Sequence, residues 1–154
     1  MTDLRLAIFL IVATLAGIAG PSSVTVERSE RALLQERSAV YVAYYWRVRP
    51  GKLTEYNAYI KGTAERIDED ARKAGAFLEV TTVLAEETPD GPRPDWTHLR
   101  IFKLATMDHV ARLSAALDAA TLRVVPSEAE RKANTARATE MRDFVRREVW
   151  RALQ

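Results

Sequence analysis

Residues 40–48 read VYVAYYWRV, a run in which valine and aromatic side chains fill most positions. Side chains of this kind favour an extended chain, so the run predicts a β-strand. Successive side chains of a strand point to opposite faces, which places the even-numbered positions from Val40 on one face and the odd-numbered positions from Tyr41 on the other. Pro50 and Gly51 then stop the strand. A sheet therefore opens the folded domain.

Helical and extended patterns alternate after this strand. A helix that closes at Gly75 is predicted by apolar residues at steps of three and four: Leu53, Tyr56, Ile60, Ala64, Ile67, Ala71 and Ala74. Residues 77–84 and 96–104 alternate in the manner of strands. The connection between them contains Pro89, Pro92 and Pro94, which predicts a hairpin with a long loop.

The C-terminal third predicts two further helices and a weak strand. Thr106 can cap a helix whose first turn holds Asp108. Thr121 to Val125 is interpreted as a short fourth strand, stopped by Pro126. Ser127 and Glu130 have the spacing of a capping box, and the last helix is predicted to run from there to Leu153.

This order of elements predicts an α+β fold of ferredoxin-like type, an antiparallel sheet with its helices on one face and an extra C-terminal helix. The other sheet face is left uncovered, unless the last helix covers it. The residues predicted on that uncovered face are Tyr41, Ala43, Tyr45, Arg47, Glu79, Thr81, Val83, Trp96, His98, Arg100 and Phe102. A face so rich in aromatic groups predicts a homodimer that closes over it, with room for a small ligand.

The N-terminus predicts export. Leu6 to Ala19 is an apolar run preceded by Arg5, and Gly17 and Ala19 supply the small residues that precede a cleavage site. We expect a signal peptide over residues 1–19, a linker over 20–38, a domain over 39–154, and a periplasmic or secreted protein. The alternatives are an inner-membrane anchor formed by residues 6–20, which would be the only membrane contact, and a buried helix.

Composition narrows the function classes. The chain has 154 residues, enough for one core. Its 23 basic and 21 acidic residues are interspersed and leave a net charge of +2, which argues against a nucleic-acid-binding protein. The absence of cysteine excludes disulfides, thiolate metal sites and cysteine nucleophiles. His98 and His109 lack the spacing of paired metal ligands, so we expect neither a metal nor a cofactor.

The layout resembles the dimeric α/β-barrel proteins of ferredoxin-like fold, whose members include cofactor-independent monooxygenases. The features that carry this resemblance are the strand at 40–48, the Arg49-Pro50-Gly51-Lys52 turn into a tyrosine-containing helix, and the aromatic strand at 96–104. No catalytic motif is among them. Residues 142–151, RDFVRREVWR, are similar to the tail of a group of exported bacterial proteins.

His98 and Arg100 are the candidate catalytic pair, because an imidazole beside a guanidinium stays neutral and can accept a proton. Arg47 and Arg100 together could hold a carboxylate, although pairing with Glu79 accounts for the same residues. The candidate ligand-binding residues are Tyr41, Tyr45, Arg47, Glu79, Trp96 and Phe102. Ordinary roles in packing and hydrogen bonding explain these residues more simply.

Three functions remain open on the sequence. The first is an exported, dimeric domain that binds a small apolar or anionic ligand on its sheet face. The second is a cofactor-independent monooxygenase or isomerase, with His98 as proton carrier, Arg100 as anion stabiliser and Tyr45 as pocket wall. The third is an envelope interaction module that uses its last helix. The sequence does not decide whether the protein is an enzyme.

Overall fold

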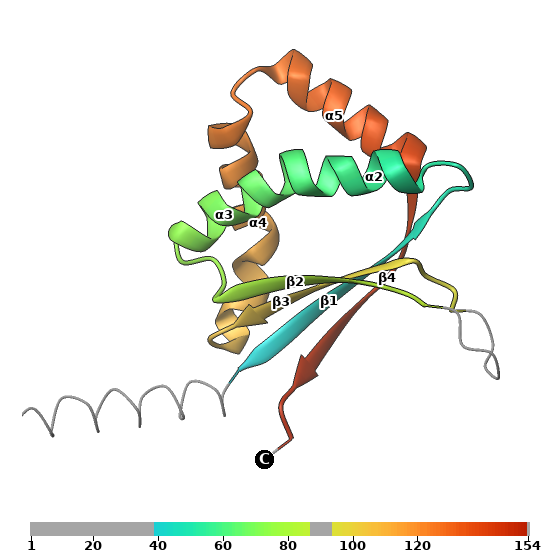
Figure 1. Cartoon of the computed structure of the whole chain (residues 1–154). Coiled ribbons are helices and arrows are strands. Elements are labelled where there is room, and N and C mark those ends of the chain that lie inside the picture. The colour runs from blue at the N-terminus through green and yellow to red at the C-terminus, as the bar shows by residue number, and fades with distance from the viewer. Residues whose placement is uncertain (1–38, 87–93, 154) are drawn as a thin grey trace, which may run out of the picture.

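The computed structural model describes residues 39–86 and 94–153. Their strands form one antiparallel sheet in the order β2-β3-β1-β4 (Figure 1). The strands are β1 (Val40–Val48), β2 (Glu79–Leu84), β3 (His98–Leu104) and β4 (Arg142–Arg151). This strand order, with one helical segment between β1 and β2 and a second between β3 and β4, is the ferredoxin-like arrangement. It confirms the predicted fold class.

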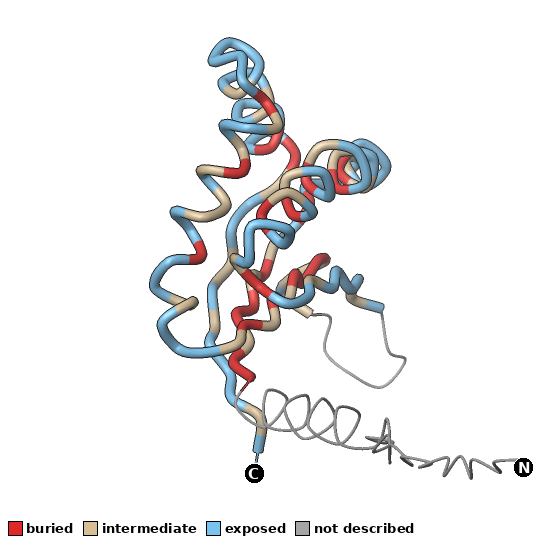
Figure 2. Tube along the Cα trace, turned by 90° about the vertical axis from the view of Figure 1, so that its left-hand side faces the viewer, coloured by how far each residue is buried: buried red, intermediate tan, exposed pale blue. Residues whose placement is uncertain are grey.

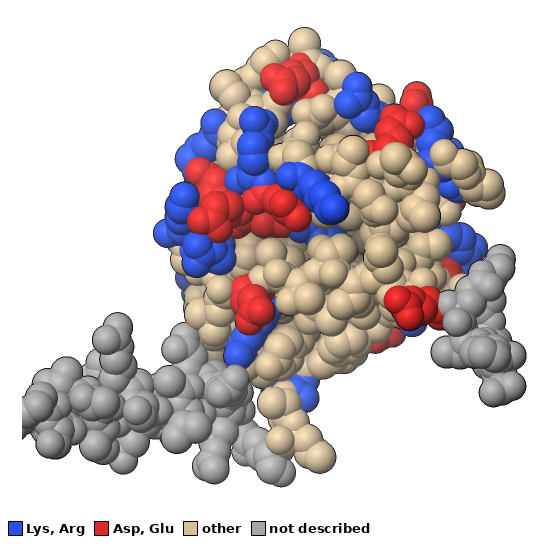
Figure 3. Space-filling view, viewed as in Figure 1, with Lys and Arg blue, Asp and Glu red and all other residues tan. Residues whose placement is uncertain are grey.

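The described helices lie on one side of the sheet (Figure 1). They are α2 (Leu53–Tyr59), the π-helical turn η1 (Ile60–Ala64), α3 (Glu65–Lys73), α4 (Met107–Val124) and α5 (Glu128–Met141). α3 and α4 pack on each other, and α5 lies against α2 before the chain enters β4. Acidic and basic side chains are interleaved over α3 on the face seen in Figure 3. Within α3, Arg72 pairs with Glu69.

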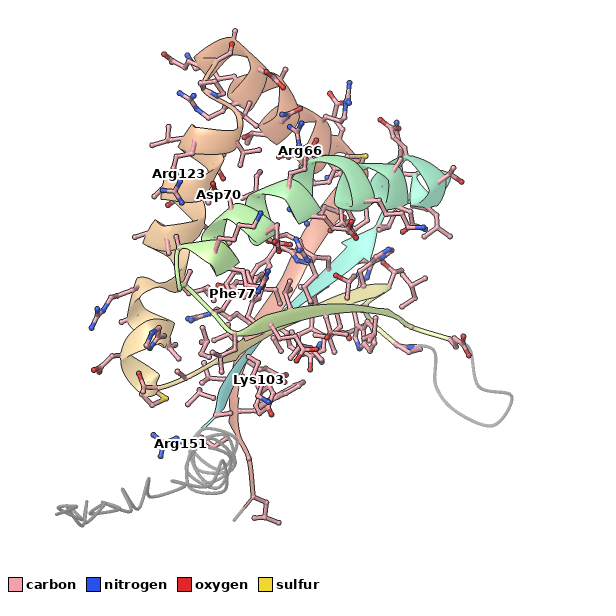
Figure 4. The ribbon with its side chains drawn as sticks, turned by 60° about the vertical axis from the view of Figure 1, so that its left-hand side comes forward. Arg66, Asp70, Phe77, Lys103, Arg123 and Arg151 are labelled. Atoms are coloured by element: carbon pink, nitrogen blue, oxygen red, sulfur yellow. The ribbon has the colours of Figure 1, made fainter. Side chains whose placement is uncertain are left out.

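The main core fills the space between the sheet and the paired helices α3 and α4. Val42 of β1 and Phe102 of β3 are partners in the ladder, and both are buried there with Leu113 of α4. Phe77 enters the same core from the turn after α3 (Figure 4). Buried positions in Figure 2 are accordingly concentrated where the helices meet the sheet.

The π-helical turn keeps one face of the helical segment formed by α2, η1 and α3 toward the sheet. The buried positions recur at steps of four, at Tyr56, Ile60, Ala64 and Asp68. In an α-helix of 3.6 residues per turn, each such step drifts by about 40° around the axis. The wider turn at η1 offsets part of that drift. The sheet-facing stripe therefore continues from Tyr56 to Asp68.

The C-terminal third differs from the prediction in two places. Residues 121–124 are the end of α4, where the Thr121 hydroxyl donates to the Leu117 carbonyl at 2.8 Å, so the predicted short strand is wrong. The capping box is confirmed on one side, since Ser127 Oγ accepts from the Glu130 amide at 3.3 Å. However, α5 ends at Met141, and residues 142–151 form the fourth strand instead of a continued helix.

The face assigned to the third strand is also wrong. In the ladder with β1, His98 lies opposite Trp46 and Phe102 lies opposite Val42, so these residues face the helices. The face without helices carries Leu99, and the buried Ala43 lies opposite the partly buried Ile101. Trp96 joins this second face, which therefore holds only part of the predicted set.

The predicted signal peptide, anchor and linker lie outside the described residues. Within 39–86 and 94–153, none of the helices combines the length and the hydropathy that crossing a bilayer requires.

Candidate functional site

A pocket of about 390 Å³ opens between the sheet and α4. Its walls combine aromatic rings, two arginines and one carboxylate: Tyr44, Trp46, Arg100, Phe102, Ser114, Leu117, Asp118 and Arg142. The lining residues from β1, β3 and β4 lie on the helix-facing side of the sheet, and the remaining lining residues come from α4. Such a mixture of apolar walls with a few polar groups is typical of small-molecule sites.

Arg100 brings a buried cation to the floor of this pocket. Its guanidinium pairs with Asp68 of α3, and both residues are more than nine-tenths buried. Burial lowers the pKa of Arg100, because the charged form loses its hydration. Its Nε atom is buried and has no hydrogen-bond partner in the described structure. An unsatisfied buried donor is costly to the fold.

Arg142, the first residue of β4, supplies the second cation. Its guanidinium lies over the Trp46 ring at 3.7 Å from the centroid, and it donates to the Tyr56 hydroxyl. Burial raises the pKa of Tyr56, and the charge of Arg142 partly opposes this effect. Among the described residues no carboxylate pairs with Arg142, so its charge is available to an anion.

His98 lies beside this arrangement but is not part of the pocket wall. Its ring is fully buried and meets the Tyr56 ring edge-on at 4.8 Å. Nε2 donates to Asn57 Oδ1 at 2.8 Å, which leaves Nδ1 to accept from the Thr97 hydroxyl at 3.0 Å. Burial, aided by the nearby charge of Arg142, lowers the pKa of His98 to about 4. The imidazole is therefore neutral at pH 7.

This buried imidazole should make the fold acid-sensitive. The pKa of His98 is about 4 in the folded state against 6.5 for a free histidine, so the unfolded chain binds the proton more tightly. Stability is fully present above pH 6.5 and is lost as the pH falls toward 4, by up to about 3 kcal/mol. We expect chemical denaturation across this pH range to show the loss of stability. His98→Gln should flatten the dependence of stability on pH, and the control variant His109→Gln should keep it. An identical slope in both variants would rule out His98 as the source.

The remaining predicted residues lie on the face of the sheet without helices. The Tyr45 hydroxyl donates to Glu148 at 3.0 Å, and its ring meets Trp96 at 5.7 Å. Burial is the largest cause that raises the pKa of Tyr45. Tyr41 and Glu79 share this face, with Glu79 opposite Lys103 in the ladder. The candidate set is thus divided between two surfaces, and only Arg100 and Phe102 line the pocket.

Two predicted pairings are wrong for this reason. Arg47 donates to the Asp95 carbonyl at 2.6 Å. It lies on the opposite face of the sheet from Arg100, so these two arginines cannot hold one carboxylate. The predicted pairing of Glu79 with Arg100 is also wrong, because Glu79 lies opposite Lys103 in the ladder and Arg100 lies opposite Thr82. The acidic partner of Arg100 is Asp68 instead.

Sequence reasoning missed Asp68, Asp118 and Arg142 as site residues. Asp68 carried a usable signal, because it falls on the same four-residue steps as the buried Tyr56. The sequence around Arg142 carried no such signal, because the position of Arg142 in the pocket depends on where β4 begins.

The comparisons with known proteins find likeness in solved structures only. No family model matches the sequence, and no curated protein matches it. HapK from Hahella chejuensis is 13% identical with a TM-score of 0.46, and the match covers 74% of this chain and 92% of that chain. An EthD-like protein from Ralstonia eutropha JMP134 is 9% identical with a TM-score of 0.49, over 75% and 92%. SnoaB, a cofactor-independent oxygenase from Streptomyces nogalater, is 13% identical with a TM-score of 0.44, over 76% and 95%.

Proposed function

We propose that the protein binds a small planar anion, such as an aromatic carboxylate, in the pocket between the sheet and α4. The observation that carries this proposal is the pair of cations that line one cavity, Arg100 and Arg142, of which Arg142 has no carboxylate partner among the described residues. A carboxylate offers these donors charged acceptors, which form stronger hydrogen bonds than neutral ones. The rings of Tyr44, Trp46 and Phe102 suit a flat ligand body.

Replacing Arg142 by glutamine should weaken the binding of 2-naphthoate by about tenfold or more, since a charge-assisted hydrogen bond is lost. Isothermal titration calorimetry on the full mature chain measures this. Arg123→Gln is the matched control, because Arg123 forms a surface ion pair with Asp70 away from the pocket. Equal affinity of Arg142→Gln and the unaltered protein would contradict the assignment, and 2-naphthamide, which lacks the charge, should bind more weakly to both.

Binding is better supported than catalysis or partner recruitment. The monooxygenase or isomerase alternative needs His98 within reach of the ligand, yet the imidazole is held by Asn57 and Thr97 outside the pocket lining. The interaction-module alternative needs an apolar stripe on the last helix. No large hydrophobic residue of α5 is exposed.

We further propose that the protein is exported and dimeric. Support for export is the apolar run from Leu6 to Ala19. Support for dimerisation is the face without helices, where Ile101 and Val145 surround the buried Tyr45 and Val83 is exposed.

Native mass spectrometry of protein recovered from the periplasm tests both proposals in one spectrum. We expect a dimer whose chains begin at Gly20. Thr81→Arg, which places a charge on the same face, should yield monomers, whereas Lys132→Ala on α5 should leave the dimer intact. A full-length chain would contradict cleavage, and a monomeric unaltered protein would contradict dimerisation.

A further inference from the structure

Asp118 is a carboxylate in the pocket wall that forms no ion pair with any of the described residues. It lies on α4, is exposed, and has Ser114 one turn earlier in the same wall. The positions three and four residues away on the helix are Ser114, Ala115, Thr121 and Leu122, none of which is basic. In the described part of the chain, no basic side chain comes within the 4.0 Å of an ion pair with Asp118.

The two arginines of the same pocket belong to the sheet side. Arg100 is on β3 and is already paired with Asp68, while Arg142 is on β4 and contacts Trp46 and Tyr56. Opposite charges thus face one cavity from two walls without meeting each other. A molecule between them would find an anion site at the sheet and a hydrogen-bond acceptor at the helix.

From this arrangement we infer that Asp118 is a specificity-determining residue, which accepts a hydrogen bond from a hydroxyl group at the end of the ligand opposite its acidic group. The inference rests on the proposed function and narrows it. The ligand class becomes planar hydroxy-aromatic acids, with the acid at Arg100 and Arg142 and the hydroxyl at Asp118. A volume of about 390 Å³ lies within the usual range of small-molecule sites, about 300–1,000 Å³.

The charge of Asp118 gives this role a signature with two parts. A hydroxyl that donates to a carboxylate gains about tenfold in affinity at a partly exposed site. A plain acid gains nothing from Asp118 and is mildly repelled by its charge. Removal of the carboxylate should therefore weaken the hydroxylated ligand while leaving the plain acid unchanged or slightly tighter. A merely structural role would weaken both.

Calorimetric titrations of the full mature chain with 2-naphthoate and 6-hydroxy-2-naphthoate test the inference. We expect the unaltered protein to prefer the hydroxylated acid about tenfold, and Asp118→Ala to bind both acids alike. Asp108→Ala removes another carboxylate of α4 that is not in the pocket wall, and should keep the preference. A third probe, 6-methoxy-2-naphthoate, has no hydroxyl proton and should behave as the plain acid.

The possible failures are distinguishable. If the unaltered protein binds the two acids equally, or if Asp118→Ala keeps the preference, Asp118 does not select the ligand although the anion site stands. If 6-methoxy-2-naphthoate binds as tightly as the hydroxylated acid, no hydrogen bond is donated to Asp118 and the inference is wrong. If neither acid binds, the proposed function fails and the role of Asp118 with it.

Discussion

Asp68→Ala should lower the free energy of unfolding by about 3–5 kcal/mol, because it leaves the Arg100 guanidinium buried without its counter-charge. Asp68 is only 5% exposed, so little solvent screens the unpaired charge of Arg100. Chemical denaturation at pH 7 followed by circular dichroism measures the change. We expect no other single substitution in this ion pair to lower the free energy of unfolding by more.

Asp70→Ala provides the matched control for that measurement. Asp70 lies on the same helix and forms an ion pair with Arg123 of α4, but at the surface (Figure 4). Exposed pairs contribute about 0–1 kcal/mol, so the cost should be small. The double variant Asp68→Leu with Arg100→Met removes both charges and should recover most of the stability. Equal losses in Asp68→Ala and Asp70→Ala would show that the Asp68 pair is solvated.

Deletion of residues 142–154 should abolish the cooperative unfolding transition. β4 pairs with β1 along its whole length, and its removal leaves a central strand as an open edge beside the core. The expected loss exceeds the usual total stability of a domain, about 5–15 kcal/mol. Thermal unfolding followed by circular dichroism would show this as the disappearance of the transition.

Deletion of residues 152–154, which follow β4, is the control and should leave the transition in place. If the segment from Arg142 onward were the end of a surface helix, the longer deletion would be tolerated nearly as well as the shorter one. A folded protein that ends at Met141 would therefore contradict the strand assignment.

Local chemistry was enough to predict the strands at the start and middle of the domain. β1 contains consecutive valine and aromatic residues, and β2 and β3 are separated by a proline-rich connection, so no competing structure fits them. The stripe of apolar residues after Gly51 likewise predicted a helical layer facing the sheet, although not its π-helical turn. The element order then limited the fold to the ferredoxin-like arrangement.

Residues 142–151 could not be assigned in the same way. The segment contains Phe144, Val145, Val149 and Trp150, which favour a strand. However, it directly follows the helix-forming residues 128–141, and no glycine or proline separates the two segments. Helix and strand are therefore close in local free energy. The open edge of β1 decides between them, because only an extended chain can satisfy its backbone groups.

The site depended on the same long-range pairing. The sequence determined that His98, Arg100 and Phe102 share a face, because alternate residues of a strand do. Which face it is follows from the register of β3 against β1, and a shift of one residue would reverse it. Arg142 meets Trp46 only because β4 begins where α5 ends. Periodicity within a segment is local and can be read from the sequence, whereas pairing between distant segments is settled by the free energy of the whole fold.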